Sequence, residues 1–346
     1  MWGVRGAALV ASMALVLSGC GAATSSAGGT ASSGSGAAGA LTVYNAQHED
    51  LVAEMVAGFT AATGITVTLR NGDDSELGNQ LVQEGKASPA DVFLTENSPA
   101  MGLVDQAGLF APVAASTLAQ VPAAYLPSSK QWAGWAARST VLAYNPAKVT
   151  KAALPTSILD LAQPQWKGRV GIAAGGADFQ AIVSAVLSLE GKDKTQAWLA
   201  ALKTNAKVYQ GNTAIMKAVD AGQIDTGVIY HYYWAKDRAE SGANSKNVEL
   251  YYFGNKDPGA FLSVSGAGVL ATSKHADAAQ KFVAFLTSKA GQEILARSKA
   301  LEYAIASGVA PNAALRPIAQ LDAPTVDPGT LNGPTVVSMM QEAGLI

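Results

Sequence analysis

The sequence predicts an α/β fold with two lobes, each a mainly parallel sheet flanked by helices. Two observations lead to this prediction. Short apolar runs alternate with helix-like segments from residue 41 to about 108, and the same alternation returns between about 138 and 262. Strands that alternate with helices are typical of open parallel sheets with helices on both faces. Roughly 300 residues are also enough for two domains with buried cores.

The first region predicts three strands, each followed by a helix. The expected strands are 41–45, 65–69 and 90–95. The expected helices are 50–62, 74–84 and a segment that ends near 106–108. This is the βαβαβα order of a parallel sheet.

The second region repeats the theme. Its expected strands are 140–144, 170–172, 207–209 and 227–230, with a helix at 179–189 after a Gly-rich loop. A strand at 263–271 and helices at 276–288 and 291–298 follow. We therefore expect lobe 1 to comprise 41–137 plus 263–313, and lobe 2 to comprise 138–262 plus 314–346.

The first 40 residues predict export and anchoring rather than folded structure. A basic residue, Arg5, precedes the apolar run 7–17, which is shorter than the ~20 residues of a spanning helix. The run ends at Leu-Ser-Gly-Cys, which resembles the bacterial lipobox, so we expect residues 1–20 to be a signal peptide and Cys20, the sole cysteine, to be lipidated. Residues 21–40 are rich in Gly, Ala and Ser, which is typical of a flexible linker.

The charge balance argues against nucleic acid as a partner. The net charge is -2, 14% of the residues are charged, and no Lys/Arg run could follow a phosphate backbone. We expect the protein to be exported and held at the outer face of the cell membrane, or on the periplasmic side, through its N-terminal lipid alone.

Polar side chains follow several of the expected strands. In open α/β sheets, ligands bind in the crevice beyond the carboxyl ends of the strands. The residues at those ends are 47–49, 96–97, 175–177 and 232–233. We therefore expect these four groups to line the cleft between the lobes.

Four of these residues form a candidate metal site. They are His48, Glu96, Tyr232 and Tyr233, called the four donors below. Each has a simpler explanation: a helix-capping or surface histidine, a carboxylate favoured by a helix N-terminus, and half-buried strand tyrosines. Together they offer one imidazole nitrogen and three oxygens, and two phenolates with a carboxylate suit a hard trivalent cation such as ferric iron.

The sequence resembles the ferric-iron-binding proteins that serve bacterial ABC importers. The segments that carry the resemblance are 41–48, 89–96 and 232–234, with weaker similarity at 135–139 and 212–214. The resemblance implies a two-lobed periplasmic-binding-protein fold of type II and the four donors as iron ligands. It also implies a monomer that delivers ferric iron, or a small ferric chelate, to a permease and its ATPase.

The resemblance further implies a synergistic anion, such as phosphate, carbonate or citrate, beside the iron. Its expected contacts are Gly175, Gly176 and Ala177 at a helix N-terminus, with Asn97, Asn212 and Arg138 nearby. Arg138 could instead pair with a surface carboxylate.

Three positions put parts of this pattern in doubt. Tyr230 and His231 stand where relatives often have two asparagines, which removes one expected anion contact. Tyr144 ends an expected strand and matches a position from which some relatives supply a further phenolate, which could displace Glu96 or His48.

Two other functions are open to such a chain. The same fold could bind an oxyanion, a phosphonate or a polyamine, and its binding would then survive loss of the Tyr232 and Tyr233 hydroxyls. A secreted metal-dependent hydrolase is the second, but the sequence has no His-Glu-x-x-His or Gly-x-Ser-x-Gly motif. We therefore expect a binding protein rather than an enzyme.

Overall fold

The computed structural model describes residues 40–346. Residues 1–39 lie outside the described residues, and with them the predicted signal peptide, Cys20 and nearly all of the predicted linker. Among residues 40–346, no helix combines the length and apolar character needed to cross a membrane.

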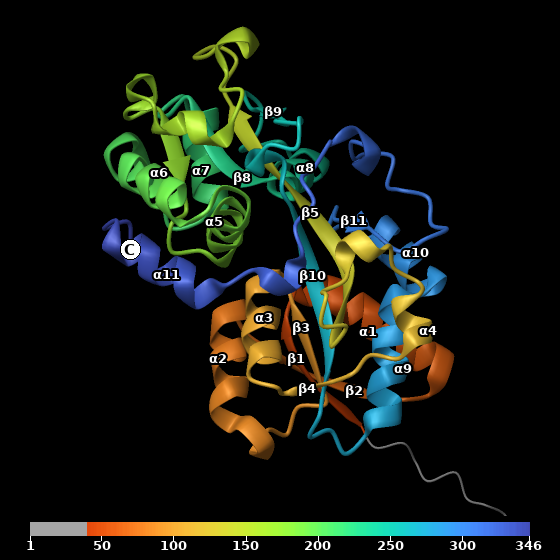
Figure 1. The fold of residues 1–346 in the computed structure, drawn as a ribbon. Helices are drawn as coiled ribbons and strands as arrows, with labels where there is room; N and C mark the ends of the chain where they lie inside the picture. The colour runs from red at the N-terminus through yellow and green to blue at the C-terminus, as the bar shows by residue number, and fades with distance from the viewer. Residues whose placement is uncertain (1–39) are drawn as a thin grey trace, which may run out of the picture. The chain divides into compact units, whose positions relative to one another are not determined.

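Within residues 40–346, eleven strands form the sheet and eleven α-helices surround it (Figure 1). The strands are β1 Leu41–Ala46, β2 Val67–Asn71, β3 Val92–Thr95, β4 Phe110–Ala111, β5 Trp132–Tyr144, β6 Val170–Ile172, β7 Ala206–Val208, β8 Thr226–Tyr230, β9 Glu249–Tyr251, β10 Leu262–Leu270 and β11 Tyr303–Ala304. The helices are α1 Glu49–Thr63, α2 Asp74–Glu84, α3 Ser98–Gln106, α4 Ala115–Leu118, α5 Ala177–Glu190, α6 Lys192–Asn205, α7 Asn212–Asp220, α8 His231–Glu240, α9 Ala276–Thr287, α10 Lys289–Arg297 and α11 Gly333–Glu342.

The strand order is β2-β1-β3-β10-β5-β8-β6-β7, with three short strands paired off this path. The β2-β1-β3 and β8-β6-β7 groups are parallel, whereas β10 and β5 are antiparallel to their neighbours. The predicted α/β class, with mainly parallel sheets and flanking helices, is confirmed.

The long strand β5 joins the two lobes. Its first part pairs with β10 as far as Ser139, and its last part pairs with β8 from Thr140 onward. We call lobe 1 the part built on β1–β4, β10 and the first part of β5, and lobe 2 the part built on β6–β9 and the last part of β5. The site residues of both lobes are therefore tied to one continuous backbone.

Each lobe has its own apolar core between sheet and helices. In lobe 1, α1 and α9 cover one face of the sheet and α2 and α3 the other (Figure 1). In lobe 2, α5 and α6 pack with the C-terminal helix α11 in one cluster, and α7 forms a second cluster on the other face. Leu315 and Leu321 pack in a lobe 1 cluster, whereas Met339 and Met340 of α11 pack in lobe 2. The lobe boundaries given above stay a prediction.

The strands and helices differ from the sequence prediction at two places that matter for the site. The strand predicted at 140–144 begins at Trp132, because this segment is buried on both faces and shows no polar alternation. Tyr232 and Tyr233 belong to the first turn of α8 rather than to the end of a strand. The strand ends at Tyr230. The aromatic residues that follow it form a helix despite their high β-propensity.

Candidate metal site

The structure brings the four donors together from three chain segments. His48 directly precedes α1, and Glu96 directly follows β3, so both lie at the carboxyl ends of lobe 1 strands. Tyr232 and Tyr233 lie in the first turn of α8 in lobe 2. The four side chains thus lie close together as the crevice rule predicts, although the tyrosines are on a helix.

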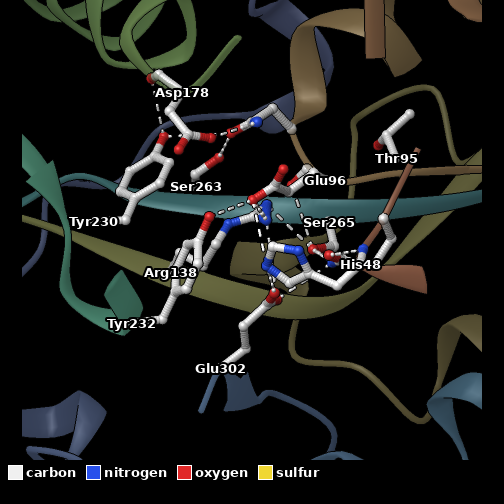
Figure 2. A network of polar contacts seen from close by, with 12 residues as sticks. His48, Thr95, Glu96, Arg138, Asp178, Tyr230, Tyr232, Ser263, Ser265 and Glu302 are labelled. Carbon is white, nitrogen blue, oxygen red and sulfur yellow. Dashed lines mark hydrogen bonds and ion pairs between the residues drawn. The ribbon is translucent and has the colours of Figure 1, made fainter. Parts of the chain in front are cut away.

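Glu96 is the centre of this group (Figure 2). The Tyr232 hydroxyl donates a hydrogen bond of 2.9 Å to Glu96 Oε1, and His48 Nε2 lies 3.6 Å from the same oxygen. The His48 ring also meets the Tyr232 ring edge-on at 5.0 Å, and the Tyr233 ring stacks on Tyr232 at 4.1 Å. A pocket of about 370 Å³ opens beside His48 and Glu96.

Arg138 and Glu302 form a buried ion pair behind Glu96. The Arg138 side chain is fully buried on β5, and its Nη1 lies 3.2 Å from Glu96 Oε1 and 3.9 Å from Glu302 Oε2. Its Nη2 donates to Ser265 Oγ at 3.2 Å. Glu302 Oε1 also lies 3.2 Å from His48 Nε2. Arg138 is therefore not a surface residue.

These contacts shift the pKa values of the group in ways that follow from burial and charge. Burial, and next the Asp178 carboxylate, raise the pKa of Glu96 to about 7, although Arg138 and His48 oppose the shift. Burial alone would lower the pKa of His48, but Glu302 and Glu96 raise it above its usual value. Burial alone would raise the pKa of Glu302, but Arg138 and His48 lower it.

The second tyrosine contacts a carboxylate of its own. The Tyr233 hydroxyl donates to Asp178 Oδ2 at 3.0 Å. Burial is the largest cause that raises the pKa of both Tyr232 and Tyr233, and the nearby carboxylates Glu96 and Asp178 raise it further. Both phenols are therefore protonated at neutral pH in the absence of a cation.

The residues predicted to hold an anion surround Asp178. Gly176 directly precedes α5, whose first residue is Ala177, and Gly175 is exposed. The side-chain amides of Asn97 and Asn212 both donate to the Asp178 carboxylate, at 3.0 and 2.8 Å. The loop and the two amides thus converge as expected, but they converge on a side chain of this protein.

A buried aspartate fixes the turn that carries Glu96. Asp74, the first residue of α2, accepts hydrogen bonds from the backbone N–H groups of Glu96 and Asn97 and from the Asn97 amide. Burial, and next the Glu96 charge, raise the pKa of Asp74 to about 8. The Asp74 carboxylate therefore holds the turn after β3 in place.

The structure does not bring Tyr144 to this group. Tyr144 is opposite Thr226, the first residue of β8, whereas the donors follow Tyr230, the last residue of β8. Its hydroxyl donates to Glu249 at 2.5 Å. Because β5 and β8 are antiparallel, the carboxyl end of β5 points away from the crevice.

Tyr230 and His231, the two residues before the paired tyrosines, have separate roles. The Tyr230 hydroxyl donates to Asn97 Oδ1 and to the Asp178 backbone oxygen, both at 3.3 Å. His231 accepts a hydrogen bond from the Ser139 N–H at 3.1 Å and stacks on Tyr303 at 4.6 Å. Burial lowers the pKa of His231 to about 4, so its ring is neutral and structural.

Sequence reasoning missed Asp178 and Glu302. Asp178 directly follows the Gly175–Ala177 loop, so an acidic residue inside an expected anion site was the available signal. Glu302 lies on a loop before β11, and β11 pairs with β5 beside Arg138. That pairing joins residues far apart in the chain, and no local pattern indicates it. His48, Glu96 and Glu302 also form a cluster whose ligand atoms lie within 4.8 Å of one another.

We predict that Glu302→Gln lowers the pKa of His48 in the metal-free protein. The substitution keeps the side-chain shape but removes a carboxylate that favours the imidazolium form. Titration of the histidine ring protons by NMR measures this pKa, and the protein has three histidines to assign.

Glu249→Gln is the matched control, because Glu249 contacts Tyr144 rather than the donor group. A His48 pKa that is the same in wild type and Glu302→Gln would show that Glu302 does not control this imidazole.

Comparison with known proteins gives a consistent result. The family model of bacterial extracellular solute-binding proteins matches residues 87–322. The Fe(3+)-binding periplasmic protein of Serratia marcescens is 62% identical over 306 residues, which cover 88% of this chain and 90% of that protein. The predicted resemblance to ferric-iron-binding proteins is thereby confirmed.

Solved structures agree with the fold. Iron-bound HitA from Pseudomonas aeruginosa has a TM-score of 0.82 and 40% identity, covering 88% of this chain and 99% of that one. A Trichodesmium protein, IdiA or FutA, in complex with iron and citrate has a TM-score of 0.79 and 27% identity, with coverage of 88% and 99%. These likenesses confirm the two-lobed fold, and the chain belongs to the family of bacterial extracellular solute-binding proteins.

Proposed function

We propose that this protein is an extracytoplasmic receptor that binds ferric iron and delivers it to the permease and ATPase of an ABC importer. The observation that carries the proposal is the convergence of two stacked phenols, a carboxylate and an imidazole on one point. The relatives named above are described as binding Fe(3+) or as iron-bound, which favours iron over an oxyanion or a polyamine.

The chemistry of the four donors fits a trivalent ion. Ionised Glu96 and two phenolates supply three negative charges, which match the charge of Fe³⁺, and neutral His48 adds a nitrogen ligand. Four ligands leave further positions of an octahedral ion for an anion or water. Tyr144 takes no part in the proposed set, because it lies at the other end of β8.

The position of the donors explains how binding would be linked to lobe movement. His48 and Glu96 belong to lobe 1, whereas Tyr232 and Tyr233 belong to lobe 2. An ion held by all four bridges the lobes, and closure around a ligand is usual for two-lobed binding proteins of this kind. A permease could then distinguish the loaded, closed form from the open one. Such a site binds and releases its cargo, and we propose no catalytic role.

We predict that metal-free protein titrated with ferric citrate develops a tyrosinate-to-iron charge-transfer band that saturates near one equivalent. The Tyr232→Phe/Tyr233→Phe double variant is expected to show no band, because the variant lacks both phenolate oxygens. Visible absorption spectroscopy measures both.

Tyr144→Phe is the matched control and is expected to keep the band at full intensity, since Tyr144 contacts Glu249 instead of the donors. A wild-type protein without a band would sink the iron proposal. A double variant that shows the wild-type band would indicate that iron binds at another site.

We also predict that iron affinity falls steeply as pH falls. Tyr232 and Tyr233 carry raised pKa values, so both phenols are protonated in the metal-free protein and both protons must leave when iron binds. Two released protons correspond to a loss of about 100-fold in apparent affinity per unit of pH. The loss becomes steeper below pH 7, because Glu96, whose pKa is about 7, also becomes protonated there.

Competition against a chelator of known pH dependence gives the slope of the logarithm of the iron affinity against pH. A slope of less than one proton per iron would contradict binding through two phenolates.

We propose in addition that Cys20 is lipidated and anchors the protein to the membrane. The support is the Leu-Ser-Gly-Cys sequence after a short apolar run and the Gly/Ala/Ser-rich stretch that follows. Cys20→Ser is expected to move the protein from the membrane fraction to the soluble fraction, while its iron-dependent absorption stays unchanged. Immunoblotting of the two fractions checks the shift, and a membrane-bound variant would contradict it.

A further inference from the structure

His48, Glu96 and Glu302 form a donor cluster that the ferric proposal does not use as a unit. The His48 Nε2 atom and one carboxylate oxygen from each glutamate all lie within 4.8 Å of one another. His48 and Glu96 belong to lobe 1, and Glu302 precedes β11, which pairs with the first part of β5. All three residues are therefore tied to one lobe, and we call them the lobe 1 triad.

We propose that the lobe 1 triad is a binding site for a divalent cation, with zinc as the ion that fits its geometry. Lobe 1 alone holds the ion, and Tyr232 and Tyr233 take no part. Zinc would compete with ferric iron, because His48 and Glu96 cannot serve two ions at once. The inference goes beyond the proposed function and does not depend on a ferric site.

Glu302 presents a buried carboxylate oxygen that has no hydrogen bond. The residue is 1% exposed, and its Oε2 accepts a hydrogen bond from Gln47 Nε2 at 3.3 Å. Within residues 40–346, neither Glu302 Oε1 nor His48 Nε2 has a hydrogen-bond partner, although the two atoms lie 3.2 Å apart. Figure 2 shows the His48 ring between the two carboxylates. A cation at this point would satisfy polar atoms that are otherwise buried without a hydrogen bond.

The spacing of the triad matches that of ligands around a tetrahedral ion. Zinc with bonds of about 2.0–2.1 Å to nitrogen and oxygen separates its ligand atoms by about 3.3–3.4 Å. His48 Nε2 lies 3.2 Å from Glu302 Oε1 and 3.6 Å from Glu96 Oε1. Imidazole and carboxylate are both common zinc ligands, and water can take the fourth position. The pocket of about 370 Å³ beside His48 and Glu96 gives the ion a route to the triad.

The charge of the triad also favours a divalent ion. Glu96 and Glu302 supply two negative charges, which match the charge of one divalent cation. Arg138 contacts both carboxylates and repels any added cation. A trivalent ion held without the phenolates would therefore leave the site with excess positive charge. Glu302 contacts the guanidinium through Oε2, so its Oε1 stays available to an ion beside His48.

The test measures zinc binding to metal-free, full-length protein by isothermal titration calorimetry. Three variants are compared with wild type: Glu302→Gln, the Tyr232→Phe/Tyr233→Phe double variant and Glu249→Gln. Glu249→Gln is the matched control, because Glu249 contacts Tyr144 and lies outside the triad. The histidine ring signals of wild type are also followed by NMR during the titration, since the protein has only three histidines.

Wild type is expected to bind one zinc ion and to show a shift of the His48 ring signals. Glu302→Gln is expected to bind zinc at least about tenfold more weakly, because even outer-shell partners of a metal site typically contribute about 10–100-fold to affinity. The double variant is expected to bind zinc at least as tightly as wild type, although it loses both phenolates. Glu249→Gln is expected to match wild type.

Two outcomes in the variants would overturn the inference. Zinc binding that Glu302→Gln leaves unchanged would place the ion elsewhere, for example at the half-exposed His275 beside Asp91. Zinc binding that the double variant loses would place the ion with the phenols, in the position proposed for iron.

The wild-type titration decides even if Glu302→Gln fails to fold. Zinc that leaves the His48 ring signals unchanged, or no zinc binding at all, would overturn the inference. Neither result bears on the ferric proposal, which depends on the tyrosinate-to-iron band. A wild-type protein that binds zinc at the triad but shows no such band would refute the proposed function and keep the zinc site.

Discussion

The close packing of carboxylates around Glu96 depends on one buried guanidinium. Arg138 is fully buried at the point where β5 passes from lobe 1 to lobe 2, and it contacts both Glu96 and Glu302. Burial alone would lower the pKa of Arg138, but Glu302 and Glu96 raise it, so the cation persists. Removing one partner of a buried ion pair typically costs about 3–5 kcal/mol, because the other charge is left uncompensated. The path of β5 therefore places the guanidinium that Glu96 contacts.

The same arrangement explains how the site stays assembled without a metal. Each phenol proton lies between the phenol oxygen and a carboxylate oxygen, in the pairs Tyr232–Glu96 and Tyr233–Asp178. Burial and the carboxylates keep these protons in place at neutral pH. Glu302 performs the corresponding task for His48 by pairing with its Nε2 atom. The two phenol protons and the contact of His48 with Glu302 thus hold the donor side chains in place without a cation.

The sequence predicts the fold and the four donors because both depend on local order. Strand-helix alternation sets the crevice, and His48 and Glu96 directly follow strands, so their convergence needs no long-range information. Glu302 depends on the pairing of β11 with β5, which no local pattern shows, whereas Asp178 has a local signal in its position directly after the Gly-rich loop. That Tyr144 lies away from the donors could not be predicted for a related reason, because the sequence does not show that β5 is antiparallel to β8. Strand direction decides which end faces the crevice.

The division of donors between the lobes determines which contacts cross from one lobe to the other. Tyr232, Tyr233 and Asp178 all lie in lobe 2, whereas His48 and Glu96 lie in lobe 1. Opening the lobes separates Tyr232 from Glu96 and Asn97 from Asp178, but leaves Tyr233 with Asp178 and Asn212. Glu96 keeps its contact with Arg138, and His48 keeps its contact with Glu302, because these partners lie within lobe 1 or on β5. The lobe 1 donors therefore have charged partners other than a metal, whereas in lobe 2 Tyr233 has only its contact with the Asp178 carboxylate.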